Sequence, residues 1–328
     1  MQSATRTAEK SSSSGNFEAF EQLLTIPYVY CISHRVGELE QFPFEAYDDV
    51  IDETLKAICN GNSVLLVGEP GIGKRSLSLG LARRLASLRK ESGNPLYSRT
   101  VYTLSLGNYF WSGGGSNNIK EMQQNVRNVF SLVEEAGPEH IVLCIDDIDI
   151  LGFVDRLVNE TGEASQSKQL FSLENTLRFL LFDKKVLCLC TCIRSAYKRL
   201  IDSDTYYDEK FTKAFRVIHM KPPNASVSLQ ILKAHKSRIE VENNASITDE
   251  AVVSTVHCAD RYLSHRAMPE KAIDVLSAAC SLVRTNKCKN TEPDKSSSST
   301  EVVVDRKDVE SLIHAWCGVT VQHDAEMP

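Results

Sequence analysis

The sequence has no apolar run long enough to cross a bilayer and no surplus of basic residues. A membrane-spanning helix needs about 20 predominantly apolar residues, so we expect a soluble chain without a membrane partner. The formal net charge is −6 and the isoelectric point is about 5.8. Because nucleic acids are bound by basic surfaces, this charge indicates no nucleic-acid partner.

The amino terminus also has no apolar segment of the kind that forms a secretory signal. Residues 1–16 are rich in serine and carry Arg6, Glu9 and Lys10. Organelle presequences contain few acidic residues, so Glu9 argues against one. The composition favours a disordered tail.

The ten cysteines have no spacing typical of a disulfide framework. They indicate reduced thiols in an intracellular reducing compartment, the cytoplasm being favoured and organelle import kept as the alternative. Cys188, Cys190 and Cys192 alternate within an apolar segment, so a strand there would place all three on one face. Buried thiols are the favoured interpretation because no further metal ligands lie nearby; a metal site is the minor alternative.

Apolar strands alternate with amphipathic helices through the first two thirds of the chain. Strands are expected over residues 63–68, 100–106, 140–151, 185–193 and 214–220. Helices are expected over residues 46–61, 73–90, 118–137 and 172–184. Because strands that are apolar on both faces must be covered on both sides, this alternation predicts a parallel sheet between two layers of helices.

The pattern changes at Pro222 and Pro223, after which helical periodicity dominates. Thr248, followed by two acidic residues, is typical of a helix start. These signals divide the chain into an extension that is partly disordered, a large αβα domain, a helical domain, a polar linker, and a short strand with a helix and tail. The predicted bounds are 1–40, 41–221, 222–285, 286–300 and 301–328.

The segment GEPGIGKRS follows an expected strand and precedes an expected helix, which is the context in which a glycine-rich loop binds phosphate. Its three glycines would let main-chain N–H groups converge on an anion, and Lys74 would neutralise the outer phosphates. A glycine-rich turn without a ligand is the less favoured alternative. The candidate nucleotide-binding residues of the loop are Gly68, Glu69, Pro70, Gly71, Ile72, Gly73 and Lys74.

Position 75 departs from the phosphate-loop pattern, which has serine or threonine after the lysine. That hydroxyl normally ligates Mg²⁺, whereas the guanidinium of Arg75 has no lone pair to offer a metal. We expect Arg75 to add positive charge beside bound phosphate instead. Ser76 lies about 100° further round the helix, so it would reach a metal only from a shifted loop.

A second motif consists of acidic residues that follow the apolar segment IVLCI. Asp146 is the expected ligand of Mg²⁺, directly or through water. Hydrolysing proteins of this kind next have a glutamate that polarises the attacking water, and this chain has the shorter Asp147. Because a general base must be placed within about half an ångström, the shorter carboxylate should slow hydrolysis. Asp149 would point the same way as Asp147 if the strand continued. An acidic strand end that meets solvent is the alternative.

With these motifs, the segment RYLSHRAMPEKAIDVLSAACSLVR resembles the lid helix of the first ATPase module of the Clp family of AAA+ unfoldases and disaggregases. DVESLIHAWCGVTV is similar to the family segment that follows the lid. The resemblance spans about residues 41–321 and implies an α/β fold class: a P-loop NTPase αβα parallel sheet followed by a small helical lid domain.

The same resemblance implies ATP or ADP as the cofactor, with Mg²⁺ as a further ligand. It also implies protein partners, including AAA+ ring neighbours. Lys271 lies in the lid motif and becomes a candidate nucleotide contact; a solvated helix lysine is the alternative.

Several positions depart from the family pattern. The catalytic finger arginines align with Lys213 and Ala214, so Lys213 keeps a charge but not the planar fork. An asparagine, Asn117 or Asn118, stands where the pore loop has tyrosine. The polar residue expected after the fourth strand has only Thr191 as a substitute, and it is out of register.

Together with Arg75 and Asp147, these departures favour a Clp-like AAA+ module that binds ATP or ADP with weak or absent hydrolysis. Such a module would act as an adaptor or regulatory subunit in protein remodelling. The second hypothesis is an active, ATP-hydrolysing protein-unfolding chaperone with Ser76 and Asp147 as adjusted parts. The candidate catalytic residues are Asp147 and Lys213. The third is a structural paralogue that binds no nucleotide.

Overall fold

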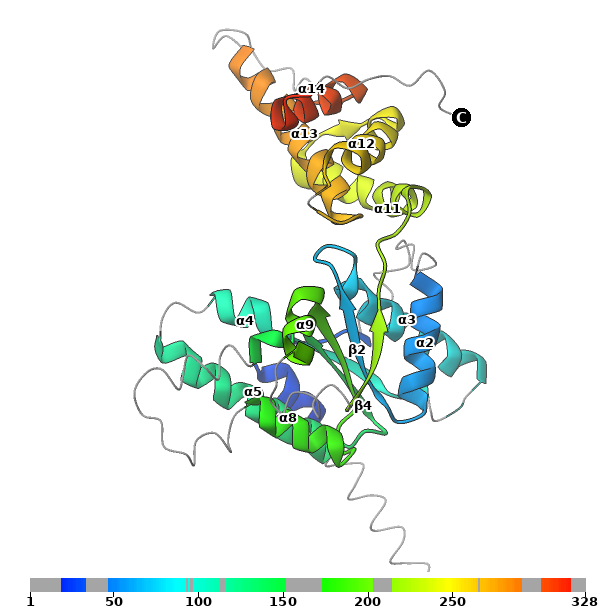
Figure 1. The fold of residues 1–328 in the computed structure, drawn as a ribbon, viewed down its shortest axis with the longest axis vertical. Helices are drawn as coiled ribbons and strands as arrows, with labels where there is room; N and C mark the ends of the chain where they lie inside the picture. The colour runs from blue at the N-terminus through cyan, green and yellow to red at the C-terminus, as the bar shows by residue number, and fades with distance from the viewer. Residues whose placement is uncertain are drawn as a thin grey trace, which may run out of the picture. The chain divides into compact units, whose positions relative to one another are not determined.

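A computed structural model describes residues 19–33, 47–92, 94, 97–112, 116–151, 173–202, 214–264, 266–290 and 302–319 (Figure 1). The chain forms two compact units. The first contains residues 1–40, 47–68 and 74–220, and the second contains residues 41–46, 69–73 and 221–328. Within the described ranges, no helix is both long and apolar enough to cross a membrane.

The first unit is built on a sheet whose six described strands run in the order β1, β3, β4, β5, β2, β6. β1 is antiparallel to β3, and the other neighbours are parallel. Most of the parallel strand residues are apolar and buried, as strands covered on both faces must be. The strand bounds are β1 Val29–Cys31, β2 Ser63–Gly68, β3 Thr100–Ser105, β4 Ile141–Asp146, β5 Cys188–Ile193 and β6 Phe215–His219.

Helices cover both faces of this sheet (Figure 1). Leu65 and Val67 of β2 belong to a core cluster with residues of α4, α5, α8 and α9, so these helices share one face. Because side chains alternate along a strand, Val64 and Leu66 point to the other face, where α2 and α3 pack. The predicted αβα layering is confirmed. The helix bounds are α2 Asp48–Cys59, α3 Lys74–Ser92, α4 Leu106–Ser112, α5 Ser116–Ala136, α8 Leu173–Phe182 and α9 Arg194–Asp202.

The three alternating cysteines of β5 lie on one face of the sheet, as their spacing predicts. Cys188, Cys190 and Cys192 are all buried in the core cluster with α5 and α8. Burial raises the pKa of the Cys190 thiol well above its usual value. Among the described residues, no group of histidine, cysteine and acidic side chains could hold a metal ion. These thiols therefore fill the core.

The second unit is a helical bundle with a short two-stranded sheet. The Thr248 hydroxyl accepts a hydrogen bond from Ala251 N at 3.2 Å, so α12 begins where the sequence predicts. β7 and β8 pair in parallel, and β7 was missed because two residues carry no periodicity. The element bounds are α11 Ala225–Asn243, β7 Ser246–Ile247, α12 Asp249–Tyr262, α13 Glu270–Asn290, β8 Val303–Val304 and α14 Arg306–Cys317.

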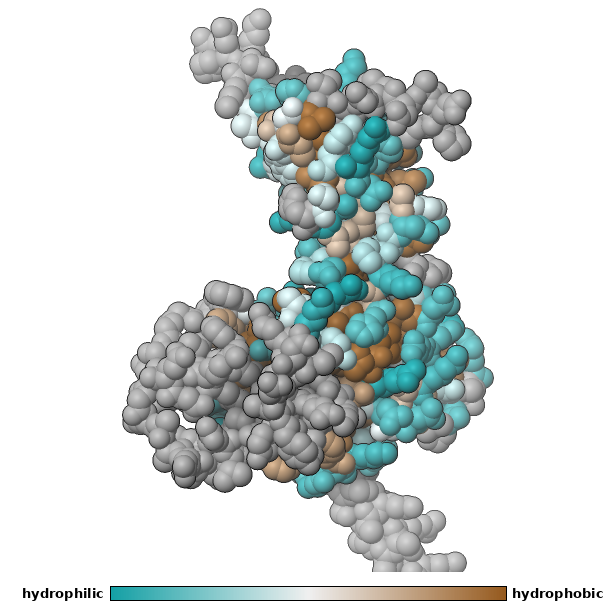
Figure 2. All heavy atoms as spheres, viewed as in Figure 1, coloured by the Kyte–Doolittle hydropathy of each residue, from teal (hydrophilic) through white to brown (hydrophobic). Residues whose placement is uncertain are grey.

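The surface of the first unit is mixed in character. On the face drawn in Figure 2, apolar surface gathers around β6, an edge strand of the sheet, and α2 beside it is largely hydrophilic. Arg216 on β6 forms an ion pair with Glu53 of α2 at 3.2 Å. Polar side chains from α2 therefore border this edge of the sheet.

Candidate functional site

The loop between β2 and α3 has the backbone conformation that a phosphate-binding loop needs. Gly71 has φ of 82° and Gly73 has φ of 90°, values that a residue with a Cβ rarely adopts. Ile72 between them is fully buried. Glu69 and Pro70 are exposed. The sequence pattern predicts this loop correctly because only glycine suits these two positions.

Lys74 opens α3 with its ammonium group already withdrawn from solvent. Its residue is 7% exposed, and Nζ donates a hydrogen bond to the carbonyl oxygen of Gly68 at 3.0 Å. A buried ammonium group is costly unless it has partners, so the position of Lys74 favours a polar or anionic neighbour. The group is therefore well placed to take an anionic oxygen as a further acceptor.

Arg75 connects the phosphate loop to the acidic end of β4. Its Nη2 donates to Oδ2 of Asp147 at 2.6 Å, and its Nε lies 3.7 Å from Oδ2 of Asp146. The arginine side chain itself is 57% exposed, so its far side meets solvent. In this structure its charge faces the two carboxylates, whereas the sequence led us to expect it beside phosphate.

Asp146 is a buried acid in a strongly charged setting. It is 5% exposed, and its Oδ1 has no hydrogen-bond partner among the described residues. Burial raises the pKa of this carboxyl to about 6; Asp147 also raises it, and the Arg75 and Lys74 cations lower it. The group therefore gains from a positively charged or hydrogen-bond-donating neighbour.

The chain turns directly after Asp146, which corrects one expectation from the sequence. Asp147 has φ of 56°, a left-handed conformation that aspartate tolerates better than most residues, and Ile150 N donates to its carbonyl oxygen. The strand predicted through residue 151 therefore ends at Asp146. Asp149 lies beyond this turn, so strand alternation cannot align it with Asp147.

Thr191 was expected to be out of register, but the sheet order gives it a defined role. β5 lies between β2 and β4, and Thr191 is paired with Leu66 of β2. Its Oγ1 accepts a hydrogen bond from Asp147 N at 2.9 Å. Thr191 thus fixes the main chain of the turn that carries Asp147. Sequence reasoning missed this contact because it depends on strand order.

The structure does not place the other candidate residues of the first unit in this cluster, and only Ser76 among them has a described side chain. Ser76 follows Arg75 in the same helical turn, so its hydroxyl is directed about 100° away from the direction of Arg75. Lys213 falls outside the described residues, and the side chains of Asn117 and Asn118 are likewise not described. The cluster that the structure brings together is thus Lys74, Arg75, Asp146, Asp147 and Thr191.

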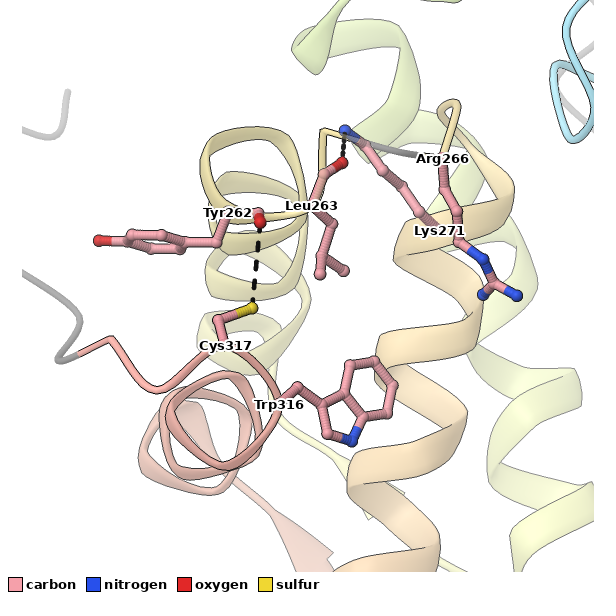
Figure 3. Close-up of a pocket in the computed structure, with 6 residues that line it drawn as sticks. All are labelled: Tyr262, Leu263, Arg266, Lys271, Trp316 and Cys317. Carbon is pink, nitrogen blue, oxygen red and sulfur yellow. Dashed lines mark hydrogen bonds between the residues drawn. The ribbon is translucent and has the colours of Figure 1, made fainter.

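Lys271 lies in the second unit, at a pocket of about 370 Å³ (Figure 3). It is 5% exposed, and its Nζ donates to the carbonyl oxygen of Leu263 at 2.9 Å, with Asp260 Oδ1 at 3.9 Å. The alternative of a solvated helix lysine is therefore wrong. Its contact with nucleotide stays a prediction. The residues that line the pocket are Tyr262, Leu263, Arg266, Lys271, Trp316 and Cys317.

Comparison with known proteins places these features in a family. A family model described as "ATPase family associated with various cellular activities (AAA)" matches residues 64–217, and the AAA lid domain model matches residues 224–313. Heat shock protein 104 of Schizosaccharomyces pombe is 28% identical over 255 residues, 77% of this chain. Chaperone protein ClpB of Staphylococcus epidermidis is 28% identical over 272 residues, 82% of this chain.

The chain has an AAA domain followed by an AAA lid domain and is similar to Clp-type AAA+ proteins. Its AAA domain contains β2 through β6, with the phosphate loop and the turn formed by Asp146 and Asp147, called the acidic turn below. Its AAA lid domain contains α11 through α13. The chain spans about a quarter of the length of the two curated relatives, 26% and 28%.

Solved structures of the family share the fold. The Hsp104–ADP complex of S. cerevisiae matches 89% of this AAA+ chain and 45% of its own chain, with a TM-score of 0.67 and 20% identity. The S. cerevisiae Hsp104–casein complex matches the same shares with a TM-score of 0.65. The predicted domain order, an αβα domain followed by a helical lid, is confirmed.

Proposed function

We propose that this chain binds adenine nucleotide at the loop Gly68–Lys74 and hydrolyses it weakly or not at all. In this proposal it serves as an adaptor or regulatory subunit in protein remodelling. The observation that carries the proposal is the 2.6 Å ion pair between Arg75 and Asp147, because it engages the carboxylate that hydrolysis would need.

Nucleotide binding is supported by the loop and by Lys74. The positive φ angles of Gly71 and Gly73 are typical of loops that turn successive N–H groups toward an anion. The withdrawn ammonium group of Lys74 lies at the start of α3, where the helix dipole also favours negative charge. These donors fit a polyphosphate, and the family model that matches residues 64–217 is described as ATPases.

Weak hydrolysis is supported by the surroundings of Asp147. A general base needs a free lone pair aligned with the water that it polarises. Asp147 Oδ2 instead accepts a hydrogen bond from the guanidinium of Arg75. The side chain is also one methylene shorter than the glutamate of hydrolysing relatives. Both features would reduce catalysis while leaving the phosphate-binding loop intact.

The remodelling role is proposed from the relatives. One relative is named as a heat shock protein and another as a chaperone, and one solved structure is of Hsp104 with casein. We propose that this chain likewise contacts protein partners, including AAA+ neighbours in a ring. A regulatory role within such an assembly agrees with a site that holds nucleotide without turning it over.

An active ATPase is the second candidate, and Thr191 is the observation that favours it. Its hydroxyl lies between the phosphate-loop strand and the acidic strand and positions the Asp147 main chain at 2.9 Å. This contact, with Lys74 and Asp146, is compatible with an adjusted catalytic site. In such a site Arg75 would have to leave Asp147 before the reaction.

Lys74→Ala tests the binding half of the proposal. Loss of the ammonium group should weaken binding of ADP at least about tenfold, or about 1.4 kcal/mol, because no other lysine of the loop replaces it. Isothermal titration calorimetry on the full chain measures this affinity. Lys56→Ala, an exposed lysine of α2, is the matched control and should bind as the wild type does. Equal affinity of Lys74→Ala and wild type would show that the loop is not the nucleotide site.

A further inference from the structure

The guanidinium of Arg75 faces Asp146, the expected metal ligand, and the neighbouring carboxylate of Asp147. It contacts Asp147 Oδ2 at 2.6 Å through Nη2 and approaches Asp146 Oδ2 at 3.7 Å through Nε. Asp146 was the residue expected to hold Mg²⁺. A positive group of this chain therefore already faces the carboxylates that a metal would use.

The residues around this pair fit a hydrated Mg²⁺ poorly. Mg²⁺ requires six oxygen ligands in nearly octahedral geometry. Position 75 supplies no oxygen, and the Ser76 hydroxyl is turned about 100° away from it. A Cβ built on Gly107 would lie 3.3 Å from Asp147 Oδ2 and 3.5 Å from Arg75 Nη2, so the main chain of α4 closely borders the ion pair. Little room is left there for a metal with its water shell.

The charges of the cluster already balance without a metal. Lys74 and Arg75 are cationic and Asp146 and Asp147 are anionic, so their formal charges cancel. With serine at position 75 the same cluster would carry a net negative charge beside a polyphosphate, and a divalent cation would relieve that repulsion. Mg²⁺ added to the present cluster would instead face two cations at short range.

We infer that Arg75 replaces Mg²⁺ in this site, so that the chain binds ADP or ATP as the metal-free polyphosphate. The inference rests on the proposed nucleotide binding and adds the chemical form of the ligand. The exposed side of Arg75 would face the phosphate groups while its other side remains on the acidic turn. Most proteins with a phosphate loop supply a hydroxyl at this position, so the substitution would change which form of nucleotide is recognised.

The test compares ADP binding by the full-length protein in EDTA and in millimolar Mg²⁺, by isothermal titration calorimetry. Wild-type affinity should be the same within about threefold in the two conditions. Arg75→Ser restores the hydroxyl, so this variant should bind at least about tenfold more weakly in EDTA than in Mg²⁺. The readout is the ratio between conditions, because any loss of positive charge lowers affinity in both.

Arg84→Ser is the matched control. Arg84 lies on the same helix and forms an ion pair with Asp52 at 3.1 Å, away from the acidic turn. This variant should show the same metal independence as wild type. A wild-type affinity that rises tenfold or more with Mg²⁺, or an Arg75→Ser variant that stays metal-independent, would overturn the inference. Absence of wild-type binding in both conditions would overturn the proposed function itself.

Discussion

At the scale of single residues, position 75 shows what a motif can and cannot predict. The sequence alone shows that the metal-binding hydroxyl is missing, because the residue type is read directly. The guanidinium donates a hydrogen bond to Asp147, which lies 72 residues further along the chain, and no local pattern encodes this contact. The contact depends on β2 and β4 lying on either side of β5. For the same reason, the sequence did not indicate the hydrogen bond that Asp147 N donates to Thr191 Oγ1.

His235 on α11 provides a residue-scale prediction about stability. Burial lowers the pKa of its imidazole to about 4; Arg238 lowers it further, and Glu242 raises it. Below about pH 6.5 the unfolded chain takes up a proton that the folded chain accepts only near pH 4. The free energy of unfolding is therefore unaffected by this group above about pH 6.5. It decreases by up to about 3 kcal/mol as the pH falls to 4.

Urea unfolding between pH 7 and pH 4 measures this loss. The chain has two tryptophans, so Trp111→Phe leaves Trp316 on α14 as the reporter of the lid domain. Within that background, His235→Gln should flatten the dependence of stability on pH over this range. If both proteins lose the same stability on acidification, His235 is not the responsible group.

At the scale of elements, local sequence signals predicted where long helices begin and end. α5 ends at Ala136, directly before Gly137 with φ of 86°, and α12 begins after its Thr248 cap. The short strands β1 and β7 have only three and two residues, too few for an alternation to be recognised. The order of strands in the sheet is a long-range property, and periodicity along one strand does not carry it.

The start of α14 yields a prediction at this scale. Asp305 accepts from Lys307 N at 2.8 Å and Asp308 N at 3.2 Å, and Asp308 reciprocates by accepting from Asp305 N at 2.9 Å. This is a capping box, so Asp305→Ala should destabilise the lid domain by about 1 kcal/mol. The urea midpoint followed by Trp316 fluorescence measures the change.

Lys307→Ala is the matched control for the cap, because its exposed side chain lies next to Asp305 and its main-chain N–H remains available. It should leave the urea midpoint nearly unchanged. An equal loss of stability in both variants would mean that the cap contributes nothing specific.

At the scale of the whole molecule, the sequence predicted an αβα domain and a helical lid because apolar strands gave way to helices near Pro222. The phosphate loop and the acidic residues Asp146 and Asp147 were also predicted from motifs that need no knowledge of the fold, although the turn at Asp147 was not. What the motifs could not supply was the relation between them, in which Arg75 pairs with Asp147. The proposed weak hydrolysis depends on that ion pair.

Phosphate release from ATP tests this account most directly. The purified full chain is incubated with saturating ATP and Mg²⁺, free phosphate is followed for hours, and the bound nucleotide is then recovered and identified. The account predicts fewer than about one turnover per hour and ATP still bound, far below the usual enzyme range of about 1–10³ s⁻¹. Sustained release near 1 s⁻¹ that Asp147→Asn abolishes, with ADP recovered from the protein, would contradict it.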